Sequence, residues 1–323
     1  MVCRHIEDAR HYSPLDCQSP HAVLKTRVPA SASIFSDIKR SSSRFVTIAM
    51  VGLFVLTLAL NLIFSVGRGF YLPIYNASHH LVTPTLIGAG TLGVVVVAVL
   101  VIFGKLPFHD FGWIRTKLVP GLTATAVLWI VMQLIEVVTA IATKGRLQLS
   151  PTLTSAEWTT VVGVLIGQAL GTAPAEETWF RGFLLPQLRI RLGQLSPAPA
   201  LGLAIVASQA LFALYHLPNL LLGNSRVVGT SALDVTSQLG IDFAVGVLFA
   251  GIYIRTGNLF LLIGIHALLN AGTSVVATPI DPVPVLLGLA VLVLVLTFVL
   301  PRPCRVACGW TNRRTAEKQL GPL

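Results

Sequence analysis

Two adjacent glutamates, Glu176 and Glu177, interrupt an otherwise apolar part of the chain, and Arg181 follows the second of them by four positions. Residues four apart share one face of a helix, so Glu177 and Arg181 can form an ion pair. Glu176 would point about 100° away and has no such local partner. The spacing therefore favours Glu176 for chemistry, although an interfacial charged patch at a helix end would show the same residues.

Two further motifs have the same spacing of four. Phe212 precedes His216, and His266 precedes Asn270, in segments that are otherwise mostly apolar. A single histidine in an apolar helix is often only a hydrogen-bonded packing residue. His266 and Asn270, however, would point the same way from one helix, and such a polar pair faces a neighbouring helix or a water-filled cavity rather than lipid.

Together the three motifs supply a carboxylate, two imidazoles and a carboxamide, which is the equipment for hydrolysing an amide bond. A glutamate can act as general base on water, histidines can orient the water or hold a metal, and His and Asn can donate hydrogen bonds to an oxyanion. The sequence contains no Gly-x-Ser-x-Gly elbow, no His-Glu-x-x-His motif and no phosphate-binding loop. No arrangement for nucleophilic catalysis therefore competes with activated water.

The elements that position these groups are predicted to lie in a membrane. Charged residues make up 11 % of the 323 residues and hydrophobic residues 54 %, with a mean hydropathy of +0.78. Soluble proteins carry roughly 25 % charged residues, so the composition excludes a typical cytosolic enzyme, a secreted disulfide scaffold and a disordered chain. Eight apolar runs approach the length of a membrane span: Phe45–Val66, Leu81–Gly104, Leu118–Ala142, Trp158–Ala173, Ala198–Leu222, Leu239–Ile254, Leu259–Ala277 and Val283–Leu300.

The runs are too long for barrel strands and do not alternate in polarity, so they favour helices. The predicted fold class is all-α, a polytopic membrane bundle of about eight transmembrane helices with a polar catalytic cavity. Glu136 lies near the outer end of its run and is predicted to be interfacial.

The net charge of +10 is distributed by membrane side. Nineteen of the 23 lysines and arginines fall in alternate segments beginning with the N-terminal one, and four fall in the segments between. The positive-inside rule then predicts a multi-pass integral protein with both termini in the cytosol, most simply in the cell membrane. A basic patch for nucleic acid would not segregate in this way, so no nucleic-acid partner is expected.

The segment that carries the glutamates is too long for one span. Pro174 interrupts it, which predicts a new or kinked helix near that point. A hairpin turning near Ser196 would bring Glu176 and His216 to similar heights, because each lies twenty residues from the turn. His266 reaches the same level only if this hairpin projects beyond the bilayer.

The ordered motifs Glu-Glu-x-x-x-Arg, Phe-x-x-x-His and His-x-x-x-Asn resemble those of a known family. They are similar to the intramembrane proteases that process CAAX proteins and bacteriocins, the type II CAAX prenyl endopeptidase or abortive-infection family. The resemblance covers roughly residues 158–277, and all three motifs are intact. It implies an intramembrane endopeptidase whose substrate is a peptide or protein, with lipidated substrates as one option, and whose surroundings are membrane lipid.

The resemblance also implies roles for the motif residues. Glu176 would be the catalytic base, with His216 helping to activate the water, and His266 and Asn270 would stabilise the oxyanion. No cofactor is favoured. A zinc-dependent version remains open, in which Glu176, His216 and His266 would be the metal ligands and one position would stay free for water.

Three other motif residues would support the site. By resemblance, Glu177 and Arg181 hold it together and Phe212 forms a wall of the cavity.

These predictions divide the chain into three parts. Residues 1–44 form a flexible cytosolic arm, residues 45–300 the transmembrane protease domain with its motif core at 158–277, and residues 301–323 a basic cytosolic tail. Two other functions remain open. A proton-coupled transporter also places Glu and His inside a helical bundle, and a non-catalytic immunity or scaffold protein could keep the same fold.

Overall fold

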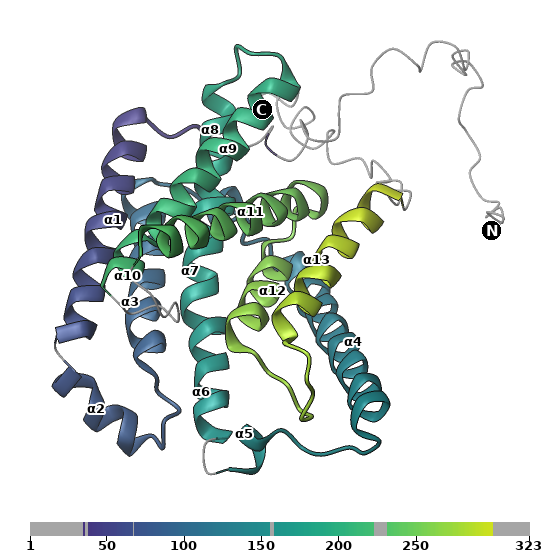
Figure 1. Cartoon of the computed structure of the whole chain (residues 1–323). Coiled ribbons are helices and arrows are strands. Elements are labelled where there is room, and N and C mark those ends of the chain that lie inside the picture. Colours follow the sequence, from purple (N-terminus) through teal and green to yellow (C-terminus); the bar gives the residue numbers. More distant parts are fainter. Residues whose placement is uncertain (1–34, 36–37, 67, 156–157, 223–230, 300–323) are drawn as a thin grey trace, which may run out of the picture.

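Figure 1 shows the computed structural model of the chain, which describes residue 35 and residues 38–66, 68–155, 158–222 and 231–299. The named regular elements in these residues are all helices, so the predicted all-α membrane bundle is confirmed. The predicted basic tail and residues 1–34 of the predicted arm lie outside the described residues.

Within the described part of the chain, six helices are long and apolar enough to cross a membrane. They are α1 (Ser43–Val66), α3 (Pro84–Ala98) with the π-helical turn η2 (Val99–Phe103), α4 (Leu118–Lys144), α9 (Pro197–Tyr215) with α10 (Leu217–Leu221), α11 (Ala232–Thr256) and α13 (Pro282–Val299). By length and composition the predicted count of eight is therefore not confirmed. One remaining run gives the 13-residue α12 (Leu259–Ala271), which ends where Gly272 adopts a left-handed backbone.

The other remaining run begins a helical rod that continues far beyond the predicted segment. The rod consists of α6 (Trp158–Gly167), the π-helical turn η5 (Gln168–Thr172), α7 (Ala173–Glu177), the π-helical η6 (Thr178–Leu184) and α8 (Leu185–Arg191). Pro174 lies in the first turn of α7, as predicted. A rod from 158 to 191 is about 50 Å long, which exceeds the roughly 30 Å of a bilayer core.

Short elements connect the long ones. They are α2 (Arg68–Ala77), the 3₁₀ turns η3 (Phe108–Phe111) and η4 (Arg115–Lys117), and α5 (Pro151–Thr154). Ser196 directly precedes the first residue of α9, so the hairpin between α8 and α9 turns where the sequence predicts. In Figure 1 this hairpin rises above the neighbouring helices, as the height argument requires.

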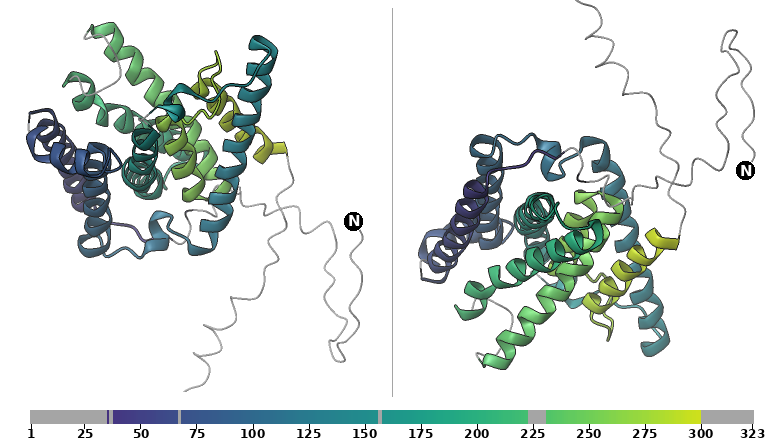
Figure 2. Two further views of the ribbon diagram at one scale, coloured as in Figure 1. Left: turned by 90° about the horizontal axis from the view of Figure 1, so that it is seen from below. Right: turned by 90° about the horizontal axis from the view of Figure 1, so that it is seen from above.

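Figure 2 views the bundle along the rod, which lies between α1 and α3 on one side and α12 and α4 on the other. Glycines on the rod face α3. A Cβ atom at Gly167 would lie 2.8 Å from Oγ1 of Thr83, and one at Gly171 would lie 3.2 Å from the backbone nitrogen of Gly90. This close approach leaves no room for side chains, so it fixes the rotation of the rod about its own axis.

Polar side chains of α4 hold the loop that follows α12. Trp129 Nε1 donates to Thr273 Oγ1 at 2.9 Å, and Gln133 Nε2 donates to the Thr273 carbonyl at 2.8 Å. Glu136 is fully buried and accepts a hydrogen bond from Ser274 Oγ at 2.9 Å. The loop thus folds back over Glu136 and encloses its carboxyl group in protein, while its interfacial depth in the membrane stays a prediction.

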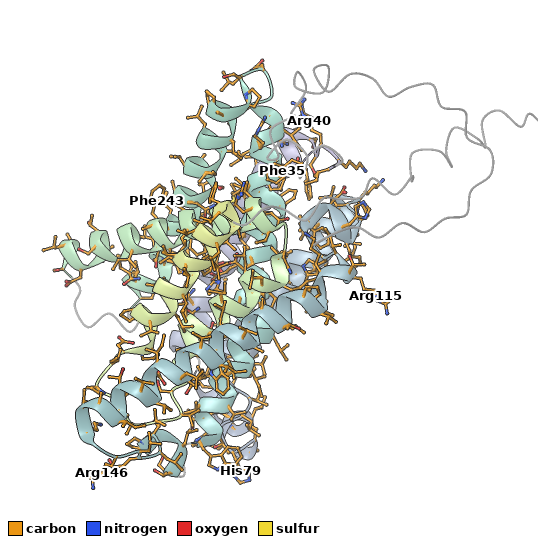
Figure 3. The ribbon with its side chains drawn as sticks, turned by 90° about the vertical axis from the view of Figure 1, so that its right-hand side faces the viewer. Phe35, Arg40, His79, Arg115, Arg146 and Phe243 are labelled. Carbon is orange, nitrogen blue, oxygen red and sulfur yellow. The ribbon has the colours of Figure 1, made fainter. Side chains whose placement is uncertain are left out.

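Figure 3 shows how segments predicted on opposite sides of the membrane are arranged. Arg40, from a predicted inner segment, lies at one end of the bundle, and His79 and Arg146, from predicted outer loops, lie at the other. Arg115, from another predicted inner segment, lies between these two ends, so the two labelled outer-loop residues share one end while the labelled inner-segment residues do not share the other.

Candidate active site

Glu177 is fully buried and joins two helices through one oxygen atom. Its Oε1 accepts a hydrogen bond from Arg181 Nη1 at 2.9 Å within the rod and another from His266 Nδ1 at 2.8 Å on α12. The predicted pairing of Glu177 with Arg181 is confirmed. Because a carboxylate only accepts hydrogen bonds, the bond to His266 places a proton on Nδ1 and leaves Nε2 for the site.

Glu176 is 5 % exposed and faces both histidines of the motifs. Its Oε2 lies 3.7 Å from Nε2 of His216 and 3.8 Å from Nε2 of His266. Among the described residues this oxygen has no hydrogen-bond partner. The distances exceed a direct hydrogen bond, and the oxygen is closed off from water in this arrangement of the side chains. They also confirm that His216 and His266 lie at the same depth in the bundle.

His216 follows the last turn of α9, and its ring is held from behind. Nδ1 lies 2.9 Å from the carbonyl oxygen of Phe212, which can only accept, so Nδ1 donates and Nε2 is the ring nitrogen that faces Glu176. The side chain of His216 is 24 % exposed, against 9 % for His266 and 6 % for Glu176. Of these three groups, His216 therefore lies closest to the surface of the cluster.

Phe212 contacts both Arg181 and His216. Its ring centroid lies 4.1 Å from Cζ of Arg181, a cation–π contact, and 4.8 Å from the ring of His216. Arg181 is fully buried, and its Nη2 also reaches the carbonyl oxygen of Gly246 at 3.5 Å. The guanidinium therefore has a carboxylate, a carbonyl and an aromatic face around it, which offsets the loss of water.

Asn270 lies one turn after His266 on α12, as the spacing predicts. Its Nδ2 donates to Oε1 of Gln168 at 3.0 Å. The three motifs thus meet around the rod: Glu176 and Glu177 from α7, His216 from the end of α9, and His266 with Asn270 from α12.

The donor set can be tested for zinc. Two imidazoles and a carboxylate match the ligands of a catalytic His₂Glu site, and the Glu177 bond to Nδ1 of His266 has the form that orients metal-binding histidines. Ligand atoms of a tetrahedral zinc lie about 3.4 Å apart, so the separations of 3.7 and 3.8 Å would have to shorten slightly. In the described ranges, no group of three or more His, Cys, Asp or Glu side chains is arranged to hold a metal. The residues fit zinc in kind but are not spaced as a finished metal site.

An apolar groove of about 480 Å³ runs beside the rod, on the side facing α3. Its wall includes Gly93 and Val97 of α3, Leu170 and Pro174 of the rod, and Trp113. Trp113 Nε1 donates to Oγ1 of Thr178, the residue directly after the glutamates, at 2.9 Å. The groove therefore lies close to the segment that carries the two glutamates, with an almost wholly apolar lining.

Residues 157–272 match the family model of Rce1-like proteins, described as type II CAAX prenyl endopeptidase Rce1-like. The match covers 116 of the 323 residues. It runs from the start of the rod to the end of α12 and contains all three motifs, so the resemblance noted from the sequence is confirmed. Comparison with curated proteins gave no match, and comparison with solved structures gave none either. The Rce1-like match indicates a CAAX-type intramembrane protease, which is a hydrolase.

Several residues of the matched segment that contact the motif residues were not predicted, among them Gln168 and Gly246. Gln168 appears in the sequence as one polar residue in an apolar run, and Gly246 as one glycine of a long helix. Nothing in either position signals a role until the partner helices are in place.

Proposed function

We propose that this protein is an intramembrane endopeptidase in which Glu176 activates the water that hydrolyses a peptide bond. One observation carries the proposal: Oε2 of Glu176, buried and without a hydrogen-bond partner among the described residues, faces Nε2 of both His216 and His266 at 3.7 and 3.8 Å. A water held between these atoms has two acceptors for its protons, Glu176 and His216. Its lone pair is then free to attack a carbonyl carbon.

The proposed reaction begins as Glu176 takes a proton from the water while the oxygen bonds to the scissile carbonyl carbon. The electron pair of the carbonyl moves to its oxygen, and Asn270 and His266 donate hydrogen bonds to that oxyanion. Glu176 then returns the proton to the leaving nitrogen as the C–N bond breaks, giving a carboxyl group and an amine.

This scheme requires a particular protonation state of His266. Nδ1–H is committed to Glu177, so donation to an oxyanion needs a second proton on Nε2. Glu176 and Glu177 supply two negative charges around the ring, and Arg181 supplies one positive charge. An imidazolium at His266 would make the cluster neutral, which is the favourable state for a buried site.

The apolar groove supports a substrate that carries an apolar chain. A groove of about 480 Å³ with this lining has room for a lipid-like chain beside the glutamates. The charge asymmetry of the loops favours a cell membrane with the α8–α9 hairpin on its cytosolic side. The substrate would then enter the groove from the cytosolic side. We therefore propose a lipidated peptide or protein substrate.

A zinc-dependent version of the same protease is the second candidate, favoured by the His₂Glu donor set. Glu176, His216 and His266 would hold the ion, which would polarise a bound water. Here His266 would be neutral and bind through the Nε2 lone pair, so the two versions differ in the protonation state of this residue.

The proposal is tested by purifying the full chain in detergent and measuring cleavage of a quenched-fluorescent peptide that ends in a farnesylated CAAX sequence. We expect E176Q to lower kcat by about 10²–10⁴-fold, the contribution of a general base, and H216A to lower it strongly. The matched control is E136Q, which alters another buried glutamate and keeps the acceptor for Ser274. Wild-type activity in E176Q would contradict the proposal, and Glu176-dependent proton flux in liposomes without cleavage would favour a transporter instead.

A further inference from the structure

We infer that Gln168, which lies outside all three motifs, is a positioning residue for the oxyanion site: its side-chain carbonyl orients the carboxamide of Asn270. The inference rests on the proposed function, because the role of Asn270 is proposed there. Asn270 Nδ2 donates to Gln168 Oε1 at 3.0 Å, and both side chains are partly buried.

The orientation of Asn270 matters because the two ends of a carboxamide have nearly the same shape and opposite hydrogen-bonding character. Nδ2 donates, whereas Oδ1 only accepts. A half-turn of the amide would present an acceptor to the reacting oxygen and repel the negative charge that develops there. Oε1 of Gln168 accepts from Nδ2 at 3.0 Å, so in this structure the donor end of the Asn270 amide is held on the side of Gln168.

A π-helical turn brings Gln168 to this position. In an unbroken α-helix, a residue eight positions before Glu176 would be turned about 80° away from it. Gln168 opens the π turn η5, which takes in one extra residue and turns the helix back by about 100°. Gln168 and Glu176 then lie about 20° apart, and both η5 and α7 pack against α12.

The rod cannot rotate to bring another residue to this place. Gly167 and Gly171, on either side of Gln168, pack against α3 so closely that added Cβ atoms would lie 2.8 and 3.2 Å from atoms of Thr83 and Gly90. This contact holds Gln168 towards α12. π-Helical turns occur often at functional sites, and here the turn aligns a carboxamide with the proposed base.

The test compares two variants of Gln168 in the farnesylated-peptide assay. Q168L removes the acceptor, and we expect kcat to fall about tenfold, the rate equivalent of one hydrogen bond, with KM unchanged. Q168E keeps an acceptor oxygen and should lose less kcat than Q168L, with a partial loss from the charge that it adds near the oxyanion. The matched control is Q238L, which removes a half-buried glutamine that donates to Asp242 at 2.9 Å on α11.

A double variant distinguishes positioning from a general structural role. If Gln168 acts through Asn270, Q168L should lower kcat in wild type and add nothing in an N270A background, measured by single turnover with enzyme in excess. Unchanged kcat in Q168L, equal losses in Q168L and Q168E, or additive losses with N270A would each overturn the inference. Failure of the proposed function is recognised separately, because then E176Q would cleave the peptide as well as wild type does.

Discussion

His266 Nδ1 lies 2.8 Å from Oε1 of Glu177, although the two residues are 89 positions apart in the chain. The same oxygen also binds Arg181, so one buried atom connects the rod to α12 and fixes the ring of His266. Glu177 is therefore the residue that turns Nε2 of His266 towards Glu176. The two adjacent glutamates therefore make different contacts: Glu177 links the rod to α12, and Glu176 faces the two histidines.

Removing the Glu177 carboxylate is expected to slow the reaction while the other site residues, Glu176 and His216, are still present. E177L loses both hydrogen bonds and frees the ring of His266, so we expect kcat to fall about 10–100-fold, as for other residues that orient a catalytic histidine. E177Q keeps an acceptor oxygen and should lose less. Steady-state cleavage of the farnesylated peptide measures both, and an E177L enzyme with wild-type kcat would contradict this role.

Arg181 is expected to matter for stability because its partner is buried with it. R181M would leave the carboxylate of Glu177 without its cation in a fully buried position, at a cost of about 3–5 kcal/mol. The double variant R181M/E177L removes both charges and should be more stable than R181M alone. Thermal unfolding in detergent compares R181M, E177L and the double variant with the wild-type protein. Equal or additive destabilisation in the double variant would show that the buried pair is not the cause.

Gly246 makes room for the arginine. A Cβ atom at this position would lie 2.8 Å from Gln209 Oε1 and 3.3 Å from Arg181 Nη2, and both side chains are fully buried. We expect G246A to destabilise the protein by about 1–3 kcal/mol, the range for overpacking, and to lower kcat. On the same helix G240A has open space around it and should be neutral or slightly stabilising. Unfolding temperatures that rise equally in both variants would refute the steric argument.

The sequence predicts those parts of the site that depend on one helix alone. A spacing of four places Glu177 with Arg181 and His266 with Asn270 wherever the helices go. Gln168 could not be found in this way, because its direction depends on the π turn η5, which shifts the helical phase and leaves no mark in the residue types.

Contacts between distant segments also lie beyond a periodicity argument. The order of spans predicts a bundle, but the folding of Ser274 over Glu136 depends on where the chain goes after α12. The length of a run is equally insufficient: α12 stops at Gly272, and the rod continues past Pro174 through the π-helical η6 and on into α8. Lengths and interhelical contacts are tertiary properties, whereas the apolar composition already requires the membrane.

Metal removal decides between the two versions of the protease, because they need different states of His266. With Nδ1–H held by Glu177, an imidazolium can donate from Nε2 to an oxyanion, while only the neutral ring can bind zinc through that atom. We expect protein stripped with a chelator, with its metal content measured by elemental analysis, to keep full activity on the farnesylated peptide. Activity that is lost on stripping and restored by stoichiometric zinc would overturn this expectation and establish Glu176, His216 and His266 as the ligands. The E136Q protein, treated in parallel, controls for damage caused by the chelator.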